Sequence, residues 1–156
     1  MRINNFFKLV IAVVVLELAG VTGSFFTISE IPTWYSTLTK PALNPPAWIF
    51  GPVWVTLYAL MGISLWLVWK SNSGEKKRAI WLFVVQLALN AIWSPIFFGA
   101  HSIGNALVVI VLLWAAIVLT ILIFKKISKP AAWLLVPYIL WVSFAGYLNF
   151  SIWMLN

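Results

Sequence analysis

The feature that most constrains the fold is a series of five long apolar segments. They cover approximately residues 6–28, 47–69, 79–98, 103–124 and 131–154. Each comes close to the ~20 residues that an α-helix needs to cross the hydrocarbon core of a bilayer. Backbone groups in lipid must be satisfied within the protein, and the segments lack the strict alternation of barrel strands. Residues 1–156 are therefore predicted to form one all-α integral membrane domain of five transmembrane helices.

The composition agrees with a multi-pass membrane protein and narrows its chemistry. Of the 156 residues, 63% are hydrophobic and only 8% are charged, whereas a soluble domain has about 25% charged residues. Cys and Asp are absent, the only carboxylates are Glu17, Glu30 and Glu75, and the only histidine is His101. This inventory is poor in metal ligands and in acid–base pairs. We therefore expect no metal site and no required cofactor.

The basic residues lie mainly on one side of the predicted bundle. Nine of the ten are in the N-terminus and the second and fourth connections: Arg2, Lys8, Lys70, Lys76, Lys77, Arg78, Lys125, Lys126 and Lys129. Cytoplasmic loops are enriched in Lys and Arg. The pattern therefore predicts an N-terminus inside, a C-terminus outside and an outside loop at 29–46. It also explains the net charge of +7 through topology, which argues against a nucleic-acid partner.

The first outside loop is rich in proline and aromatic residues. The stretch WYSTLTKPALNPPAWIFGPVW runs from Trp34 to Trp54 and contains four prolines. Proline fixes φ and removes a backbone donor, so this stretch is not expected to be a plain helix. We expect residues 29–46 to form a stiff lid over a pocket for a flat apolar ligand.

Polar and aromatic residues recur at helical spacing on three of the apolar segments. The three sets are Trp54, Tyr58, Gly62, Leu65 and Trp69; Gln86, Asn90, Trp93, Ser94 and Phe97; and Tyr138, Trp141, Ala145, Leu148 and Asn149. Because polar groups in a bilayer face the interior of a bundle, these faces are expected to converge on a pocket. Alternatively, the amides only hold the helices together, through contacts of about 0.6 kcal/mol each. One residue can serve both purposes.

The sequence allows two interpretations for each of two isolated residues, Glu17 and His101. Glu17 interrupts the first apolar segment, which argues against a cleaved signal peptide. A proton-coupled role is one interpretation of Glu17, and the favoured one is a carboxyl that is neutral or bonded to Asn90 or Tyr58. His101 lies in a short loop and has the chemistry of a haem ligand. Without a second ligand in view, it is interpreted as an ordinary loop histidine.

Three longer stretches give the chain a resemblance to a known family. They are WYSTLTKPALNPPAWIFGPVWVTLYALMG, QLALNAIWSPIFFGA and PYILWVSFAGYLNFSIW. Their order and helical placement resemble those of the translocator protein / tryptophan-rich sensory protein family, also called the peripheral benzodiazepine receptor family. The resemblance covers most of the chain from Trp34 onward, whereas the first helix matches weakly, through Gly23 and Ser24.

The resemblance implies a five-helix bundle that often forms homodimers, here in a bacterial-type cell membrane. It implies binding of porphyrins such as protoporphyrin IX and haem, and of isoquinoline carboxamide or benzodiazepine-type molecules, in a pocket under the first loop. Together with the polar stripes, it gives these ligand-binding candidates: Tyr35, Pro45, Trp54, Tyr58, Asn90, Trp93, Trp141, Ala145 and Leu148.

The sequence departs from the family pattern at two places. Ala42 and Leu43 stand where the family usually has Ser and Trp, so one lid aromatic is missing. No basic residue follows Tyr147, although the cholesterol motif of the animal members needs one. Cholesterol binding is therefore not carried over.

Three functions remain as alternatives. The favoured one is a membrane protein that binds porphyrins and acts in tetrapyrrole sensing, regulation or transport. The second is a light- and oxygen-dependent enzyme that degrades protoporphyrin IX, with Trp54 and Trp141 as catalytic residues. The third is a transporter of small apolar ligands, which the lack of a visible internal repeat disfavours.

Overall fold

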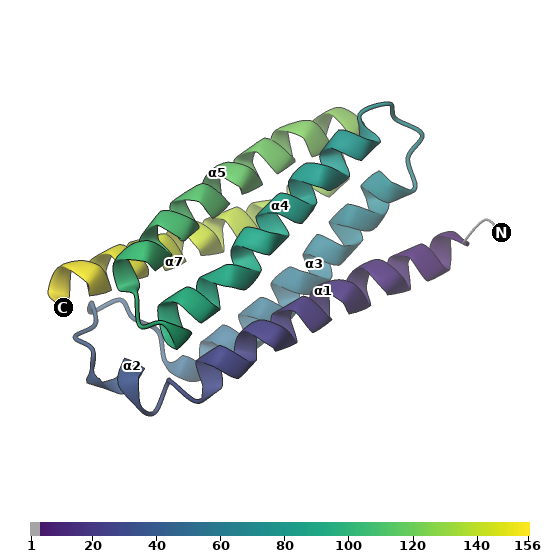
Figure 1. Ribbon diagram of the computed structural model, residues 1–156. Helices are drawn as coiled ribbons and strands as arrows, with labels where there is room; N and C mark the ends of the chain where they lie inside the picture. Colours follow the sequence, from purple (N-terminus) through teal and green to yellow (C-terminus); the bar gives the residue numbers. More distant parts are fainter. Residues whose placement is uncertain (1–3) are drawn as a thin grey trace.

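The computed structural model describes residues 4–156 and is built from five membrane-length helical units (Figure 1). They are α1, Asn5–Ile28; α3, Phe50–Trp69, entered through a 3-10 turn at Ala47–Ile49; α4, Lys76–Ser94, continued by a π-helical turn at Pro95–Gly99; α5, Ile103–Ile127; and α6, Lys129–Leu134, followed by α7, Val136–Leu155. All five are long and apolar enough to span a membrane, which confirms the predicted fold class and an integral multi-pass protein. Arg2 lies outside the described residues.

Several helices extend beyond their predicted limits because their polar ends continue past the apolar core. Helix α4 begins at Lys76 rather than residue 79, and α5 continues to Ile127 with two lysines in its last turn. Cations near a helix C-terminus interact favourably with the helix dipole. The last unit begins at Lys129 rather than residue 131, and the Ser128 hydroxyl caps it by accepting the Ala131 N–H at 3.4 Å.

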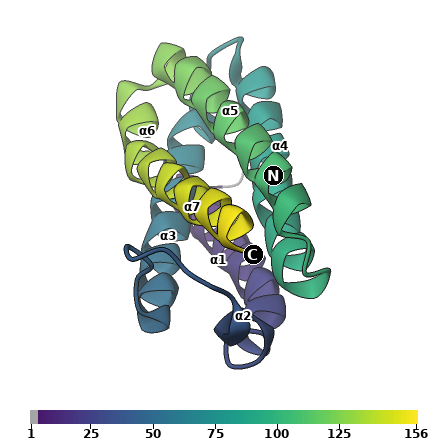
Figure 2. The same ribbon diagram turned by 90° about the vertical axis from the view of Figure 1, so that its left-hand side faces the viewer.

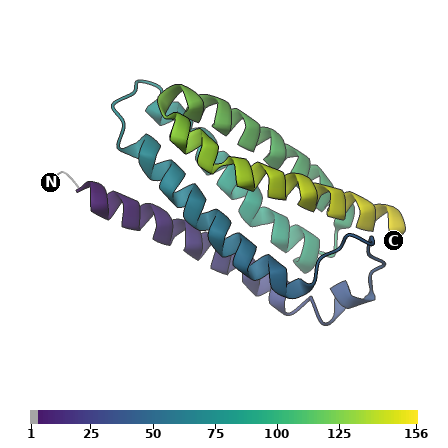
Figure 3. The same cartoon turned by 180° about the vertical axis from the view of Figure 1, so that it is seen from behind.

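The helices form a bundle in which α1 is the outermost member. Helix α1 packs along α3 and α4, α5 packs between α4 and α7, and α6 lies against α3 and α5 (Figures 1 and 2). The N-terminal end of α1 lies opposite the C-terminus, and the loop that contains α2, Trp34–Thr37, shares the C-terminal end (Figure 3). This placement agrees with termini on opposite sides of the membrane. Which side is inside remains a prediction.

Helices α1 and α3 approach so closely that glycine is required. A Cβ atom on Gly62 would lie 2.8 Å from the Val13 Cα, and one on Gly20 would lie 2.5 Å from the Tyr58 ring. Small residues let transmembrane backbones meet in this way. The contact fixes α1 beside the pocket described below.

The π-helical turn after α4 gathers aromatic rings under the lid. Pro95 lacks the backbone N–H of a regular helical bond, and the Ala100 N–H reaches back to its carbonyl at 2.8 Å. Phe97 and Phe98 in this turn are both buried, and Trp34 and Tyr35 of the lid pack on them. The predicted lid loop is thus partly helical and seated on an aromatic cluster.

Candidate ligand-binding site

An inner cavity of about 460 Å³ lies between α1, α3, α4, α5 and α7, beneath the lid. Ligand sites commonly measure about 300–1,000 Å³ and carry a few polar groups in apolar walls. Eight of the nine predicted ligand-binding residues line it: Tyr35, Trp54, Tyr58, Asn90, Trp93, Trp141, Ala145 and Leu148. Pro45 is not among the lining residues. It is half-buried in the lid, where its carbonyl accepts a 3.3 Å hydrogen bond from the Asn44 side chain.

A chain of buried hydrogen bonds joins three helices at the floor of the cavity. The Tyr58 hydroxyl on α3 donates to Asn90 Oδ1 on α4 at 2.6 Å. Asn90 Nδ2 donates to the Tyr138 hydroxyl on α7 at 3.0 Å, and that hydroxyl donates to Gln86 Oε1 at 2.9 Å. The three polar stripes therefore converge. Because Tyr58 and Asn90 also line the cavity, the same groups hold the helices together and form the pocket wall.

Trp93 is fixed in the wall by both its polar and its apolar contacts. Its Nε1 donates to Asn149 Oδ1 at 3.1 Å, and Asn149 Nδ2 donates to the Ile103 carbonyl at 2.9 Å. Its ring stacks on Phe97, with centroids 5.0 Å apart and an angle of 21° between the planes. Trp93 therefore presents a rigid aromatic surface to the cavity.

Trp54 and Trp141 face the cavity from α3 and α7. The Trp54 ring lies 5.4 Å from the Tyr58 ring, and Trp141 meets the edge of Phe50 at 5.8 Å. Trp141 Nε1 is buried and finds no acceptor within the described part of the chain. A buried donor without a partner costs about 1–3 kcal/mol. Among residues 4–156, this indole N–H is therefore an unpaired donor in the seam between α3 and α7.

Glu17 lines the same cavity from α1. The expectation that it bonds to Asn90 or Tyr58 is wrong, because those two side chains bond to each other. Glu17 makes no hydrogen bond or ion pair with any residue between 4 and 156. An intramembrane carboxyl is costly, which makes Glu17 a candidate functional residue.

The sequence analysis missed the contribution of α1. Small side chains of this helix complete the wall: Ala19, Gly20, Gly23, Ser24 and Thr27. Small residues of this kind also let neighbouring helices approach closely. Gly20 serves both purposes, since its missing side chain makes room for the Tyr58 ring at the edge of the cavity.

His101 is more than an ordinary loop residue. Its Nε2 lies 3.0 Å from Glu30 Oε2, and its ring stacks on Trp34 with centroids 4.2 Å apart and planes 9° from parallel. Its φ of 51° lies in the left-handed region that non-glycine residues rarely adopt. Surrounding contacts must hold such a conformation. Residues 30, 34 and 101 together tie the lid to the loop before α5.

Two further sets of contacts hold the lid. The Thr39 N–H donates to Asn156 Oδ1 at 2.9 Å, and Asn156 Nδ2 donates to the Thr39 carbonyl at 3.0 Å. Within the lid, the Tyr35 hydroxyl donates to Asn44 Oδ1 at 2.9 Å. Burial raises the pKa of the Tyr35 phenol above its ordinary value, which keeps this donor neutral. The lid is thus fastened at both edges.

Comparison with known proteins identifies the family. The TspO/MBR family model matches residues 11–154, nearly the whole chain. The chain belongs to the TspO/MBR family. The family resemblance seen in the sequence is thereby confirmed, and it includes the first helix, where the sequence match was weak.

Relatives of this TspO/MBR protein come from bacteria, archaea and animals. The chain is 52% identical over 141 residues to "Tryptophan-rich protein TspO" of Chlorobaculum tepidum, covering 88% of each chain. It is 42% identical over 152 residues to the protein of that name from Archaeoglobus fulgidus, covering 97% of this chain and 99% of the relative. It is also 42% identical over 143 residues to "Translocator protein" of Bos taurus, covering 90% and 85%.

Proposed function

We propose that this TspO/MBR protein binds a flat tetrapyrrole, such as protoporphyrin IX or haem, and acts in tetrapyrrole sensing, regulation or transport. The observation that carries the proposal is the inner cavity, which is walled by Trp54, Trp93 and Trp141 from three helices and covered by an aromatic lid. Its volume of about 460 Å³ suits a ligand with several fused or linked rings.

The aromatic walls supply enough free energy for useful affinity. Each well-placed ring contact contributes about 0.5–1.5 kcal/mol beyond the burial of apolar area. Three or four contacts together with burial are consistent with a binding free energy of about −8 kcal/mol, which corresponds to a micromolar dissociation constant.

Charges at the two ends of the cavity favour one orientation of a porphyrin. Lys40 lies over the ring of Tyr35, which lines the cavity at the lid, with Nζ 4.7 Å from the ring centroid. Glu17 lies deeper, on α1, and repels carboxylates when ionised. We infer that the propionates point toward the lid and the apolar macrocycle points inward.

A titration in the dark tests the proposal. Protein in lipid nanodiscs is titrated with protoporphyrin IX, and tryptophan quenching is followed for wild type, Trp141→Phe and Trp133→Phe. Trp133 is the matched control because it is 71% exposed on the outer surface. We expect Trp141→Phe to weaken binding by up to about 12-fold, because phenylalanine has a smaller ring and no indole N–H, while Trp133→Phe binds as wild type does. Equal affinities in the two variants would exclude this cavity.

A second candidate is the light-dependent degradation of protoporphyrin IX. It is favoured by the position of Trp54 and Trp141, which both line the cavity where the pigment would lie. Illumination should then remove the porphyrin absorption band of the wild type and spare it in Trp54→Phe and Trp141→Phe. Equal loss in all three proteins would mean simple photobleaching.

Isoquinoline carboxamide and benzodiazepine-type molecules are proposed to use the same cavity, because they are also flat and aromatic. They should compete with protoporphyrin IX. Additive binding of both ligands would contradict a shared site.

A further inference from the structure

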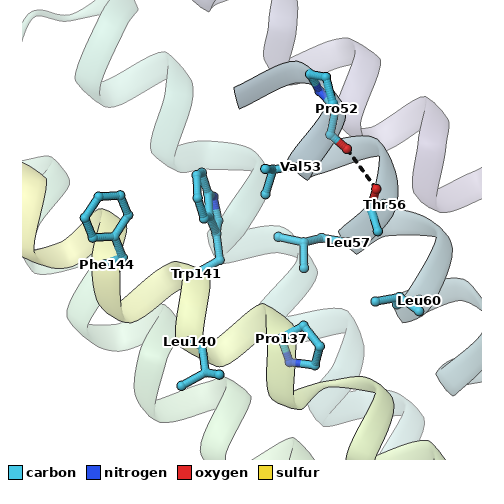
Figure 4. A pocket seen from close by; sticks show the side chains of 9 residues that line it. All are labelled: Pro52, Val53, Thr56, Leu57, Leu60, Pro137, Leu140, Trp141 and Phe144. Atoms are coloured by element: carbon cyan, nitrogen blue, oxygen red, sulfur yellow. Dashed lines mark hydrogen bonds between the residues drawn. The ribbon is translucent and has the colours of Figure 1, made fainter. Parts of the chain in front are cut away.

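A second hollow lies on the outer surface of the bundle, between α3 and α7. This outer groove has a volume of about 690 Å³ and is lined by Val53, Thr56 and Leu57 of α3 and by Leu140 and Phe144 of α7, among others (Figure 4). Both helices belong to the membrane-length units. The groove therefore opens toward the hydrocarbon of the bilayer rather than toward water.

One side chain lines both the outer groove and the inner cavity. Trp141 lines both hollows, and Figure 4 shows its indole standing between the two helices beside Val53. Its ring neighbours are Phe50 and Phe144, at 5.8 and 5.7 Å. Its Nε1 has no acceptor among residues 4–156, so no hydrogen bond from this part of the chain fixes the ring.

The seam between α3 and α7 is held by a hydrogen bond in the half of α3 that lies farther from the lid. Nearer the lid, the seam is apolar. The Ser64 hydroxyl on α3 donates to the Ala131 carbonyl on α6 at 2.7 Å, deep in the protein. Farther out, the Thr56 hydroxyl bonds only within its own helix, to the Pro52 carbonyl at 2.9 Å (Figure 4). The two helices can therefore part locally around Trp141 without losing a hydrogen bond between them.

The lid offers a more costly route to the cavity. Lifting it breaks the Glu30–His101 contact, the stacking of Trp34 on His101 and the two hydrogen bonds between Thr39 and Asn156. Moving Trp141 requires a rotamer change and the loss of its ring contacts with Phe50 and Phe144. The cheaper opening faces the bilayer.

We propose that the α3–α7 seam is the entrance through which a flat apolar ligand dissolved in the bilayer reaches the inner cavity, with Trp141 as its movable wall. This inference rests on the proposed function, because it concerns the same ligand and cavity. The position of Trp141 in the walls of both hollows argues for a ligand in transit rather than for a lipid chain held permanently in the groove.

The absence of cysteine from the sequence allows a direct test. Thr56→Cys is placed in the groove and modified with a maleimide, and Val111→Cys, on the exposed face of α5, is the matched control. In a third protein, cysteines at positions 39 and 156 are joined by a short bifunctional thiol reagent, which locks the lid. Association of protoporphyrin IX with each protein in nanodiscs, and its release to excess empty vesicles, are measured by stopped flow.

We expect the Thr56→Cys adduct to slow association and release together, each by about tenfold or more, while the dissociation constant stays within about twofold. Slower association and slower release with the same dissociation constant mean that the adduct blocks the path to the cavity and leaves the binding site intact. Unmodified Thr56→Cys, modified Val111→Cys and the lid-locked protein should exchange ligand as wild type does.

Three results would overturn the entrance. The first is unchanged exchange in the Thr56→Cys adduct, which is also the result expected if a lipid chain fills the groove, and the second is exchange that stops when the lid is locked. A weaker dissociation constant without slower association would place Thr56 in the binding site and also contradict the proposal. Failure of the unmodified protein to bind saturably would instead refute the proposed function, and with it this inference.

Discussion

The lid and the α3–α7 seam both close the inner cavity, but they do so by different physics. The lid is held by stacked rings and by hydrogen bonds between distant parts of the chain, such as Glu30 with His101 and Thr39 with Asn156. The seam is lined by apolar side chains, and one indole without a hydrogen bond stands in it. The lid is thus held more firmly than the α3–α7 seam, although the lid is the more obvious cover of the cavity.

The difference follows from the solvent around each closure. In water, separating apolar surfaces is opposed by the hydrophobic effect. In lipid, the hydrocarbon chains are as apolar as the side chains they replace, so packing alone resists separation. A membrane protein can therefore keep an apolar seam that opens at little cost, provided that polar contacts elsewhere hold the helices in register.

The largest effect is expected where those polar contacts lie. Asn90→Leu leaves the hydroxyls of Tyr58 and Tyr138 without their amide partner and should destabilise the protein by about 1–3 kcal/mol. Thermal unfolding in detergent measures this loss, with Leu140→Ala as the control at the seam. Wild-type stability of Asn90→Leu would mean that packing, and not the polar chain, holds α3, α4 and α7 together.

A smaller, local effect is expected at the lid. His101→Asn tolerates the left-handed backbone but removes the ring stacking, about 0.5–1.5 kcal/mol, and the contact with Glu30, about 0.2–1 kcal/mol. Hydrogen exchange of residues 29–46 should then rise about 3- to 70-fold, the range that the sum of these losses gives. Glu30→Gln keeps a hydrogen-bonding partner and should show a smaller rise. If neither variant changes exchange, this contact does not fasten the lid.

The smallest effect is expected at the seam. Leu140 is 65% exposed on α7, so Leu140→Ala removes little buried contact. Its unfolding temperature should stay near that of wild type, because exposed substitutions usually change stability by no more than about 0.5 kcal/mol. A loss as large as that of Asn90→Leu would show that the seam is a tightly packed interface and would remove the contrast with the lid.

The sequence predicts the helices and most of the cavity wall for clear physical reasons. Long apolar segments can only be membrane helices, and polar residues such as Asn90 must face the interior of the bundle. These two constraints are local and periodic, so a single sequence reveals them. Seven of the eight predicted residues that line the cavity lie on these helical stripes, and the eighth, Tyr35, came only from the family resemblance.

What the sequence did not reveal depends on three-dimensional contacts. Gly20 contributes to the cavity wall because it has no side chain and leaves room for the Tyr58 ring. This contact joins two different helices, so the sequence around Gly20 does not reveal it. His101 and Glu30 are 71 positions apart, so no spacing rule connects them. Pro45 was included because it is in the lid motif, but it is not among the residues that line the cavity.

The most direct test of the central claim is to map where bound protoporphyrin IX lies. Protein in nanodiscs with one equivalent of pigment is briefly illuminated in oxygen, and oxidation of each tryptophan is measured by mass spectrometry. Short-lived reactive oxygen marks the nearest indoles, so Trp54, Trp93 and Trp141 should be oxidised first, and the outward-facing Trp81 and Trp133 last. Earliest oxidation of Trp81 and Trp133 would place the pigment in the lipid and contradict a binding site between the helices.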